Sequence, residues 1–235
     1  MAFLNHFSGV GTLIIVPHQG QPCALLAHEV HKTREHGRYI VDEFGGGTEP
    51  TKTLSQSAVK ELIEESAGLI VPRRADFFAR WRHVLDMDTL TPNKQYRLHT
   101  LYLTHLDTAP FYENMRRIRG EGQCKKVGWC ETARLHHIPI QNILHLTPPK
   151  NKNHCKALLD ANGQKVYVGP RFLALIRAGL PNLLRRTLRH GPTHEPIPYK
   201  KQTIQLHLNN QPYMIGGTLQ KMNLTSWTLR RVKTS

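Results

Sequence analysis

The order of hydrophobic and polar positions predicts a chain whose first half is built around strands. Apolar runs at 11–16 and 23–30 flank a short turn that contains glycine and proline, which indicates a β-hairpin. The segment 95–106 alternates apolar and polar residues and is the clearest single strand. Composition predicts the remaining elements: strands at 38–44, 77–85 and 126–130, a turn at 86–94, a loop at 107–122 and a short helix within 133–146.

A helical pattern interrupts these strands in segment 45–68, directly after three glycines. Glu61, Glu64 and Glu65 are three and four residues apart, which places all three carboxylates on one stripe of a helix. Carboxylates this close repel each other, so a hard divalent cation such as Mg²⁺ or Mn²⁺ is the simplest partner for them. The stripe lies beside an apolar face that can be buried, formed by Leu54, Ala58, Val59, Leu62 and Ile63.

The glycines Gly45, Gly46 and Gly47 predict a loop whose backbone approaches a ligand closely. A loop that leads into a helix also presents free N–H groups to phosphate. An acidic stripe by itself is most often a solvated helix face. Loop and stripe together favour a site for pyrophosphate and metal.

This segment resembles the Nudix box, the loop–helix–loop signature of Nudix hydrolases, written G-x5-E-x7-R-E-U-x-E-E-x-G-U with U apolar. When Gly46 is placed on the first glycine, the sequence KELIEE falls on the R-E-U-x-E-E core. Three positions depart from the signature. Lys52 replaces the first glutamate, Lys60 replaces the arginine, and Ala67 replaces a glycine that arrives one place later.

The resemblance implies a fold and a metal. The fold is α/β, a Nudix-like α/β/α sandwich with a mixed β-sheet, here expected over residues 1–147. The metal is Mg²⁺ or Mn²⁺, held by Glu61, Glu64 and Glu65, with the backbone of Gly45 as a further ligand.

The resemblance also implies a reaction, the hydrolysis of a phosphoanhydride in a substrate that contains a nucleoside diphosphate. The general base is expected to be one of the three box glutamates or a distal acid. Glu121 is the first candidate for that acid, with Glu113 and Glu131 as rivals. Lys60 is expected to orient the acidic cluster, and Lys52 to contact substrate phosphate.

The predicted loop at 107–122 combines aromatic residues with cations. Phe111 and Tyr112 precede Arg116, Arg117 and Arg119. Aromatic rings suit stacking on a base, and arginines suit pairing with phosphates. The alternative is a surface loop that its aromatic residues anchor.

Basic charge is concentrated in the C-terminal part of the chain. Residues 1–132 hold 16 Lys and Arg against 15 Asp and Glu, whereas residues 133–235 hold 16 against 2. This excess suggests a polyanionic partner, with RNA first, although a solubilising surface is the plainer explanation. Residues 148–235 are expected to form a basic α+β extension, with a helix at 171–189 and short strands at 203–209, 212–216 and 219–232. A proline and a glycine near 180 are expected to kink or split that helix, whose basic face also suits an anionic membrane surface.

Three functions follow from these features. The first is a Nudix pyrophosphohydrolase that acts on the 5′ end of RNA, at the cap or a pyrophosphate. The second is hydrolysis of a small substrate, a diphosphoinositol polyphosphate or a dinucleoside polyphosphate. The third is an inactive Nudix-fold protein that binds RNA, which the departures at Lys52, Lys60 and Ala67 would explain. The chain has no apolar run long enough to span a bilayer and no dense cysteine framework, so an intracellular, cytoplasmic location is expected.

Overall fold

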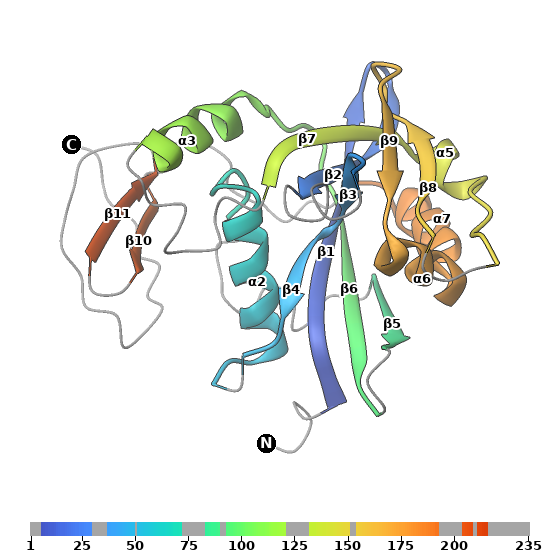
Figure 1. Cartoon of the computed structure of the whole chain (residues 1–235), viewed down its shortest axis with the longest axis horizontal. Helices are drawn as coiled ribbons and strands as arrows, with labels where there is room; N and C mark the ends of the chain where they lie inside the picture. The colour runs from blue at the N-terminus through green and yellow to red at the C-terminus, as the bar shows by residue number, and fades with distance from the viewer. Residues whose placement is uncertain are drawn as a thin grey trace.

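The structure of the chain is a computed structural model, which describes residues 6–29, 37–49, 51–71, 83–89, 93–120, 132–150, 154–192, 204–208 and 211–215. Within these residues, nine strands form one sheet and two more form a separate hairpin. Figure 1 shows the arrangement of the elements. The strands of the large sheet are β1 (Phe7–His18), β2 (Gln21–Glu29), β3 (Ile40–Asp42), β4 (Phe44–Gly47), β5 (Val84–Asp88), β6 (Gln95–Tyr102), β7 (Thr132–Pro139), β8 (Lys156–Leu159) and β9 (Lys165–Val168).

The large sheet is mixed and β1 is its hub. β1 pairs antiparallel with β2 and β4 and parallel with β6. β2 in turn pairs antiparallel with β3 and β7, and β3 pairs parallel with β9. The β1–β2 hairpin confirms the turn predicted between the first two apolar runs.

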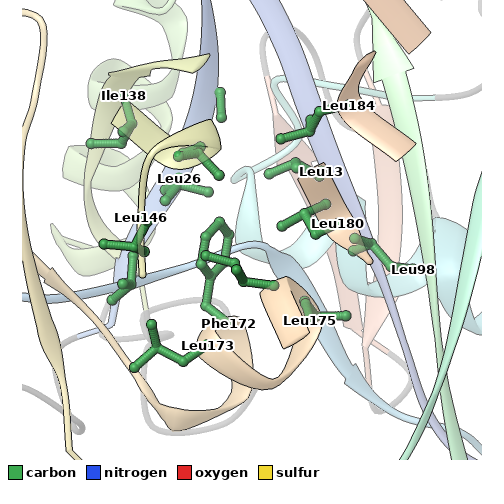
Figure 2. Packing of buried hydrophobic residues seen from close by; sticks show 14 of the residues in the cluster. Leu13, Leu26, Leu98, Ile138, Leu146, Phe172, Leu173, Leu175, Leu180 and Leu184 are labelled. Atoms are coloured by element: carbon green, nitrogen blue, oxygen red, sulfur yellow. The ribbon is translucent and has the colours of Figure 1, made fainter. Parts of the chain in front are cut away.

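Apolar residues on both faces of β1 explain why helices cover the sheet on both sides. Val10 and Ile14 belong to a buried cluster with α2 (Leu54–Glu65) and α3 (Ala109–Gly120). Leu13 and Ile15 belong to a second cluster with α5 (Ile140–Leu144), α6 (Pro170–Ala178) and α7 (Leu180–His190), part of which Figure 2 shows. We call the α2 side the box face and the other side the opposite face. The expected α/β/α sandwich with a mixed sheet is therefore confirmed.

Several element predictions need correction. The strand expected at 38–44 is two short strands that break at Glu43, and Gly45–Gly47 lies in β4 rather than in a loop. The loop expected at 107–122 contains α3, because Phe111, Met115 and Ile118 recur at helical spacing and are buried. The turn expected at 86–94 begins with β5, and most of 133–146 is β7, with the helix α5 only at its end. The strand expected at 126–130 lies outside the described residues, as do residues 77–82 of the strand expected at 77–85.

The C-terminal segment contributes to the same sheet. β9 adds to β3, and β8 pairs with β9. The basic helix is split as expected, because Gly179 has a φ of 117° and separates α6 from α7. The short strands expected at 203–209 and 212–216 are present as β10 (Ile204–Leu208) and β11 (Gln211–Ile215), which pair antiparallel, and 219–232 lies outside the described residues. Whether residues 1–147 fold without residues 148–235 stays a prediction.

Candidate functional site

The glycine segment and the acidic helix are held side by side by local sequence features. β4 pairs with Gly9–Thr12 of β1, which fixes the glycines at the sheet edge nearest α2. The helix begins at Thr53, whose hydroxyl accepts a hydrogen bond from the Gln56 N–H while the Gln56 side chain accepts one from the Thr53 N–H. This reciprocal cap fixes where the helix starts and hence where its carboxylates point.

Two glycines of β4 allow the backbone to lie directly against the helix carboxylates. The Gly45 N–H donates a hydrogen bond of 2.6 Å to Glu65 Oε2. A Cβ at Gly46 would stand 2.7 Å from the Glu61 carboxylate carbon, so no side chain fits there without moving Glu61. The glycines thus lie in a strand and not in the predicted loop, and the close approach seen here is to the helix carboxylates, while an approach to a ligand stays a prediction.

The Lys60 side chain contacts two of the three box glutamates. Its Nζ lies 2.9 Å from Glu64 Oε2 and 3.3 Å from Glu61 Oε1, and 3.1 Å from Glu49 Oε1. Lys52 forms an ion pair with the same Glu49. Both lysines that depart from the box signature therefore pair with the same residue, Glu49. Sequence reasoning did not single out this glutamate.

The surroundings of this cluster shift its proton affinities. Burial raises the pKa of Glu64 to about 7, against the opposing effect of Lys60. Burial also raises the pKa of Glu65 well above its usual range, which Arg171 partly counteracts. For Lys60 burial acts to lower the pKa, but Glu64 and then Glu61 outweigh it and hold the pKa above its usual value.

A second cation, Arg171, enters the site from the first turn of α6. Its Nε lies 3.0 Å from Glu43 Oε1 and 3.2 Å from Asp42 Oδ2, without an aligned hydrogen bond to a described residue, so these contacts are ionic. One Nη lies 3.5 Å from Glu29 Oε1, and the other donates to the Gly45 carbonyl at 3.3 Å. A residue of the predicted extension therefore completes the acidic site.

Tyr96 of β6 contacts the same acidic cluster through Glu43. Its hydroxyl donates a hydrogen bond of 2.7 Å to Glu43 Oε1. The ring reaches Glu43 through a slot where a Cβ at Gly11 or Gly45 would collide with the hydroxyl. Glu43 is fully buried, its Oε2 has no hydrogen-bond partner among the described residues, and burial raises its pKa to about 8.

Asp42, Glu43, Glu29, Arg171 and Tyr96 were missed by sequence reasoning. The one local signal was the acidic pair at 42–43 in an otherwise apolar strand directly before the glycines. Nothing in the sequence placed Arg171 near it, because the two are joined only by the β3–β9 pairing.

The donor set suits a hard divalent cation in type and in charge. The site contains seven carboxylates and three cations. The carboxylates belong to Glu29, Asp42, Glu43, Glu49, Glu61, Glu64 and Glu65, and the cations are Lys52, Lys60 and Arg171. All the oxygen donors are of the class that Mg²⁺ and Mn²⁺ take. Among the described residues, however, no three His, Cys, Asp or Glu side chains are grouped as a metal site. The fit is in donor chemistry, and the coordination itself stays a prediction.

The other predicted site residues lie apart from this cluster. Glu121 and Glu131 fall outside the described residues, and Glu113 is exposed on α3. On the same helix Arg116 and Arg119 are exposed, while Arg117 is half-buried and donates to Asn114 at 3.4 Å. The arginines of α7, namely Arg185, Arg186 and Arg189, are exposed over the opposite face. The two basic helices thus flank different sides of the sheet (Figure 1).

Comparisons with known proteins give structural neighbours only. The chain matches no family model and no curated protein. It overlaps the NUDIX domain of Shewanella oneidensis NrtR, solved with ADP ribose, at 11% identity over 62% of this chain and 80% of that one, with a TM-score of 0.34. It overlaps a C. elegans Ap4A hydrolase at 11% identity over 74% and 97% of the two chains (TM-score 0.36). A mutT/nudix family protein from Listeria innocua matches at 13% identity over 77% and 95% (TM-score 0.37). These overlaps are loose, so the chemistry of the site rests on its own side chains.

Proposed function

We propose that this protein is a metal-dependent pyrophosphohydrolase of the Nudix type, and that its substrate is the 5′ end of RNA. The observation that carries the proposal is the contact of Gly45 and Gly46 with Glu65 and Glu61. This contact joins a glycine backbone to helix carboxylates in the order that the Nudix-box resemblance implies.

Each residue of the site has a role in this proposal. Glu61, Glu64 and Glu65, with the Gly45 carbonyl, would hold Mg²⁺ or Mn²⁺, which supplies charge that stabilises phosphate oxygens and activates water. Lys60 keeps Glu61 and Glu64 in register through its contacts with both. Arg171 offsets the buried acids behind them. The general base is one of the three box glutamates or Glu121.

Lys52 has a structural role besides the one expected. The Lys52 side chain is only 12% exposed and forms an ion pair with Glu49. It therefore points toward the turn before α2. Lys52 therefore fixes Glu49, which in turn contacts Lys60. Contact between Lys52 and substrate phosphate stays a prediction, because the ammonium group has three N–H donors and the pair with Glu49 leaves donors for a second partner.

The basic surface supports RNA rather than a mononucleotide. Arg185, Arg186 and Arg189 project from α7 while its leucines are buried, so the helix presents charge to solvent. A small substrate bound at Glu61–Glu65 does not need charge on that side of the sheet. An RNA substrate also agrees with the expected intracellular, cytoplasmic location. Among the described residues no helix is long and apolar enough to cross a membrane.

The test is hydrolysis of 5′-labelled capped or 5′-triphosphorylated RNA in Mg²⁺ or Mn²⁺, with wild type beside Glu64→Gln. Release of a nucleoside diphosphate or pyrophosphate by wild type alone supports the proposal. Cleavage of free dinucleoside polyphosphates but not RNA would favour the small-substrate function instead. Deletion of residues 148–235 is unsuitable as a control, because it removes Arg171. The triple change of Arg185, Arg186 and Arg189 to glutamine is the better one, and it should weaken RNA cleavage selectively at moderate salt.

An inactive RNA-binding protein is the second candidate. The specific observation in its favour is that Lys60 contacts the carboxylate oxygens of Glu61 and Glu64 that a metal would take. Binding of RNA with no turnover of any pyrophosphate, unchanged in Glu64→Gln, is the result that would establish it.

A further inference from the structure

The β8–β9 hairpin has one sheet face that the described helices do not cover. Val166 and Val168 belong to the opposite-face cluster, so Lys165 and Tyr167, which alternate with them along β9, point to the box face. Leu159 pairs with Lys165, and it is 54% exposed. No residue of β8 or β9 belongs to the box-face cluster. In Figure 1 this hairpin lies beside α5 and α6, away from α2 and α3.

Tyr167 stands on this face beside two cations. The Arg38 guanidinium carbon lies 5.2 Å from the ring centroid, and Lys165 Nζ lies 5.6 Å from it. Both cations are exposed, and neither forms an ion pair with a carboxylate that the structure describes. Their charge is therefore available to an anion. Both cations lie over the ring, and an aromatic ring combined with Arg and Lys is typical of surfaces that bind single-stranded nucleic acid through its bases and phosphates.

The pairing of β3 with β9 places this ring next to the acidic site. Tyr167 lies directly opposite Ile40, and Asp42 follows two residues later on the same strand. Strand geometry then separates the Cα atoms of Tyr167 and Asp42 by roughly 8 Å. Asp42 pairs with Ala27 of the box-face cluster and contacts Arg171, so ring and acids share one side of the sheet.

The direction of the strands gives the ring two different sides. Arg38 and Lys165 both come before the Ile40–Tyr167 pair, whereas Asp42 and Gly169 both come after it. A Cβ at Gly169 would meet only Ile40 Cγ2, at 3.4 Å, among the described atoms. The next residue of the β9 segment on the same face as Tyr167, on the side toward the acids, is thus a glycine without a side chain.

We propose that Tyr167, with Arg38 and Lys165, stacks a base of an RNA strand whose 5′ phosphates lie at the Glu61–Glu65 site. The placement of the phosphates rests on the proposed function, but the stacking does not. The occupant is RNA because two exposed cations that pair with no described carboxylate lie over the ring, and because the C-terminal part of the chain carries a large excess of Lys and Arg over Asp and Glu. A free nucleotide bound at the acids alone would leave Arg38 and Lys165 unused.

The experiment measures RNA binding without turnover. Fluorescence anisotropy is recorded for a 5′-triphosphorylated single-stranded RNA of about ten nucleotides, in buffer without divalent metal. Tyr167→Ala is expected to weaken binding roughly 5- to 100-fold, and Tyr167→Phe by less than about twofold. Arg38→Gln and Lys165→Gln are each expected to reduce the slope of log affinity against log salt by about 1.

Tyr39→Ala is the matched control. Tyr39 is 52% exposed directly before β3, but its ring contacts His28, whose partner Val41 lies in the opposite-face cluster. This change is expected to leave RNA affinity within about twofold of wild type. Thermal unfolding shows whether each variant is folded, and Tyr167→Leu replaces Tyr167→Ala if the latter is not.

A second readout locates the base. RNA with 2-aminopurine at one of its first nucleotides should be quenched by wild type at one position, and Tyr167→Ala should abolish that quenching. Equal RNA affinity of Tyr167→Ala and Tyr39→Ala, with quenching unchanged, would overturn the stacking. Loss of affinity for a free nucleoside triphosphate as large as that for RNA would overturn RNA as the occupant. Both outcomes are independent of whether any RNA is cleaved.

Discussion

The acidic site contains two cationic centres that are built in opposite ways. Lys60 and its partners come from one stretch of sixteen residues, from Glu49 to Glu64, and Glu49 is 36% exposed at its side chain. Arg171 of α6 draws its acidic partners from β2 and the β3–β4 junction, and Asp42, Glu43 and Glu29 are all buried. The Lys60 centre is local and partly solvated, whereas the Arg171 centre exists only when distant segments have paired.

This contrast separates two roles of a cation, which are to position neighbouring side chains and to stabilise the fold. An ion pair that water reaches contributes little to stability, while a buried charge that loses its partner is strongly destabilising. We therefore expect Lys60 to matter mainly for how the box glutamates are arranged. Arg171 should matter for whether the C-terminal segment stays attached to the sheet.

The largest effect is expected for Arg171→Ala. It leaves Asp42, Glu43 and Glu29 buried without their cation, which should lower the free energy of unfolding by about 3 kcal/mol. Urea denaturation followed by circular dichroism measures this. Arg177→Ala on the same helix is the control, since Arg177 is exposed and, among the described residues, donates only to the Pro149 carbonyl. Similar unfolding midpoints for both variants would contradict the distinction between the two centres.

Gly46→Ala tests the contact between backbone and box. The added methyl would stand 2.7 Å from the Glu61 carboxylate carbon, so Glu61 must move, at a cost of about 1–3 kcal/mol. If the proposed hydrolysis holds, activity should fall at least about tenfold, because a displaced catalytic group loses its productive geometry. Gly47→Ala is matched in strand and chemistry, yet its methyl would meet only Ser8 O, at 3.9 Å. Equal losses in the two variants would mean that β4 as a whole, and not the Glu61 contact, is sensitive.

Lys60→Met asks whether lysine and metal compete for the same oxygens. The change removes the cation between Glu61 and Glu64 and should cost about 1 kcal/mol, since these side chains are only partly screened. Mg²⁺ should then raise the melting temperature more in the variant than in wild type, because binding to the folded state alone stabilises it. Lys52→Met, which removes the pair with Glu49 instead, is the control. The same Mg²⁺ response in all three proteins would show that Lys60 does not compete with a metal for Glu61 and Glu64.

Buried histidines show a third way to accommodate an ionisable group, which is to stay neutral. Burial lowers the pKa of His99 to about 3 and that of His28 to about 4. The unfolded chain binds these protons near pH 6.5, so each histidine costs stability as the pH falls from there toward its folded pKa. Carboxylates with a raised pKa add stability as the pH falls, which opposes the effect of the histidines. The contribution of one histidine must therefore be measured with a variant that lacks it.

When the pH falls from 7 to 5, the free energy of unfolding of His99→Leu should therefore decrease by about 1–2 kcal/mol less than that of wild type. Urea titrations of both proteins at the two pH values measure the difference. Parallel losses in the two proteins would show that His99 is protonated in the folded state as well.

The same distinction explains what the sequence predicted and what it did not. Helical spacing, the glycines and the acid spacing are local, so α2 and the Gly45–Glu65 neighbourhood followed from the residues alone. The helix α3 was missed because its charged and aromatic composition masked the spacing of Phe111, Met115 and Ile118. Arg171 was out of reach because its place depends on which strand β9 joins, and pairing partners are not encoded in a single strand's pattern.

The smallest effect concerns Ala67, the third departure from the box signature. Ala67 has a φ of 50°, a left-handed conformation that glycine adopts freely, and this backbone effect alone favours Ala67→Gly. Its methyl is fully buried in the box-face cluster, however, and losing it costs about 0.8 kcal/mol, while glycine also gains entropy in the unfolded chain. These terms oppose the relief of strain, so the free energy of unfolding should change by less than about 1 kcal/mol, with activity unaltered. Gly68→Ala, at a φ of 72° and without a methyl to bury in wild type, should instead destabilise by about 1 kcal/mol or more. A gain above about 1 kcal/mol for Ala67→Gly would show that the alanine is a strained substitute for the signature glycine rather than part of the core.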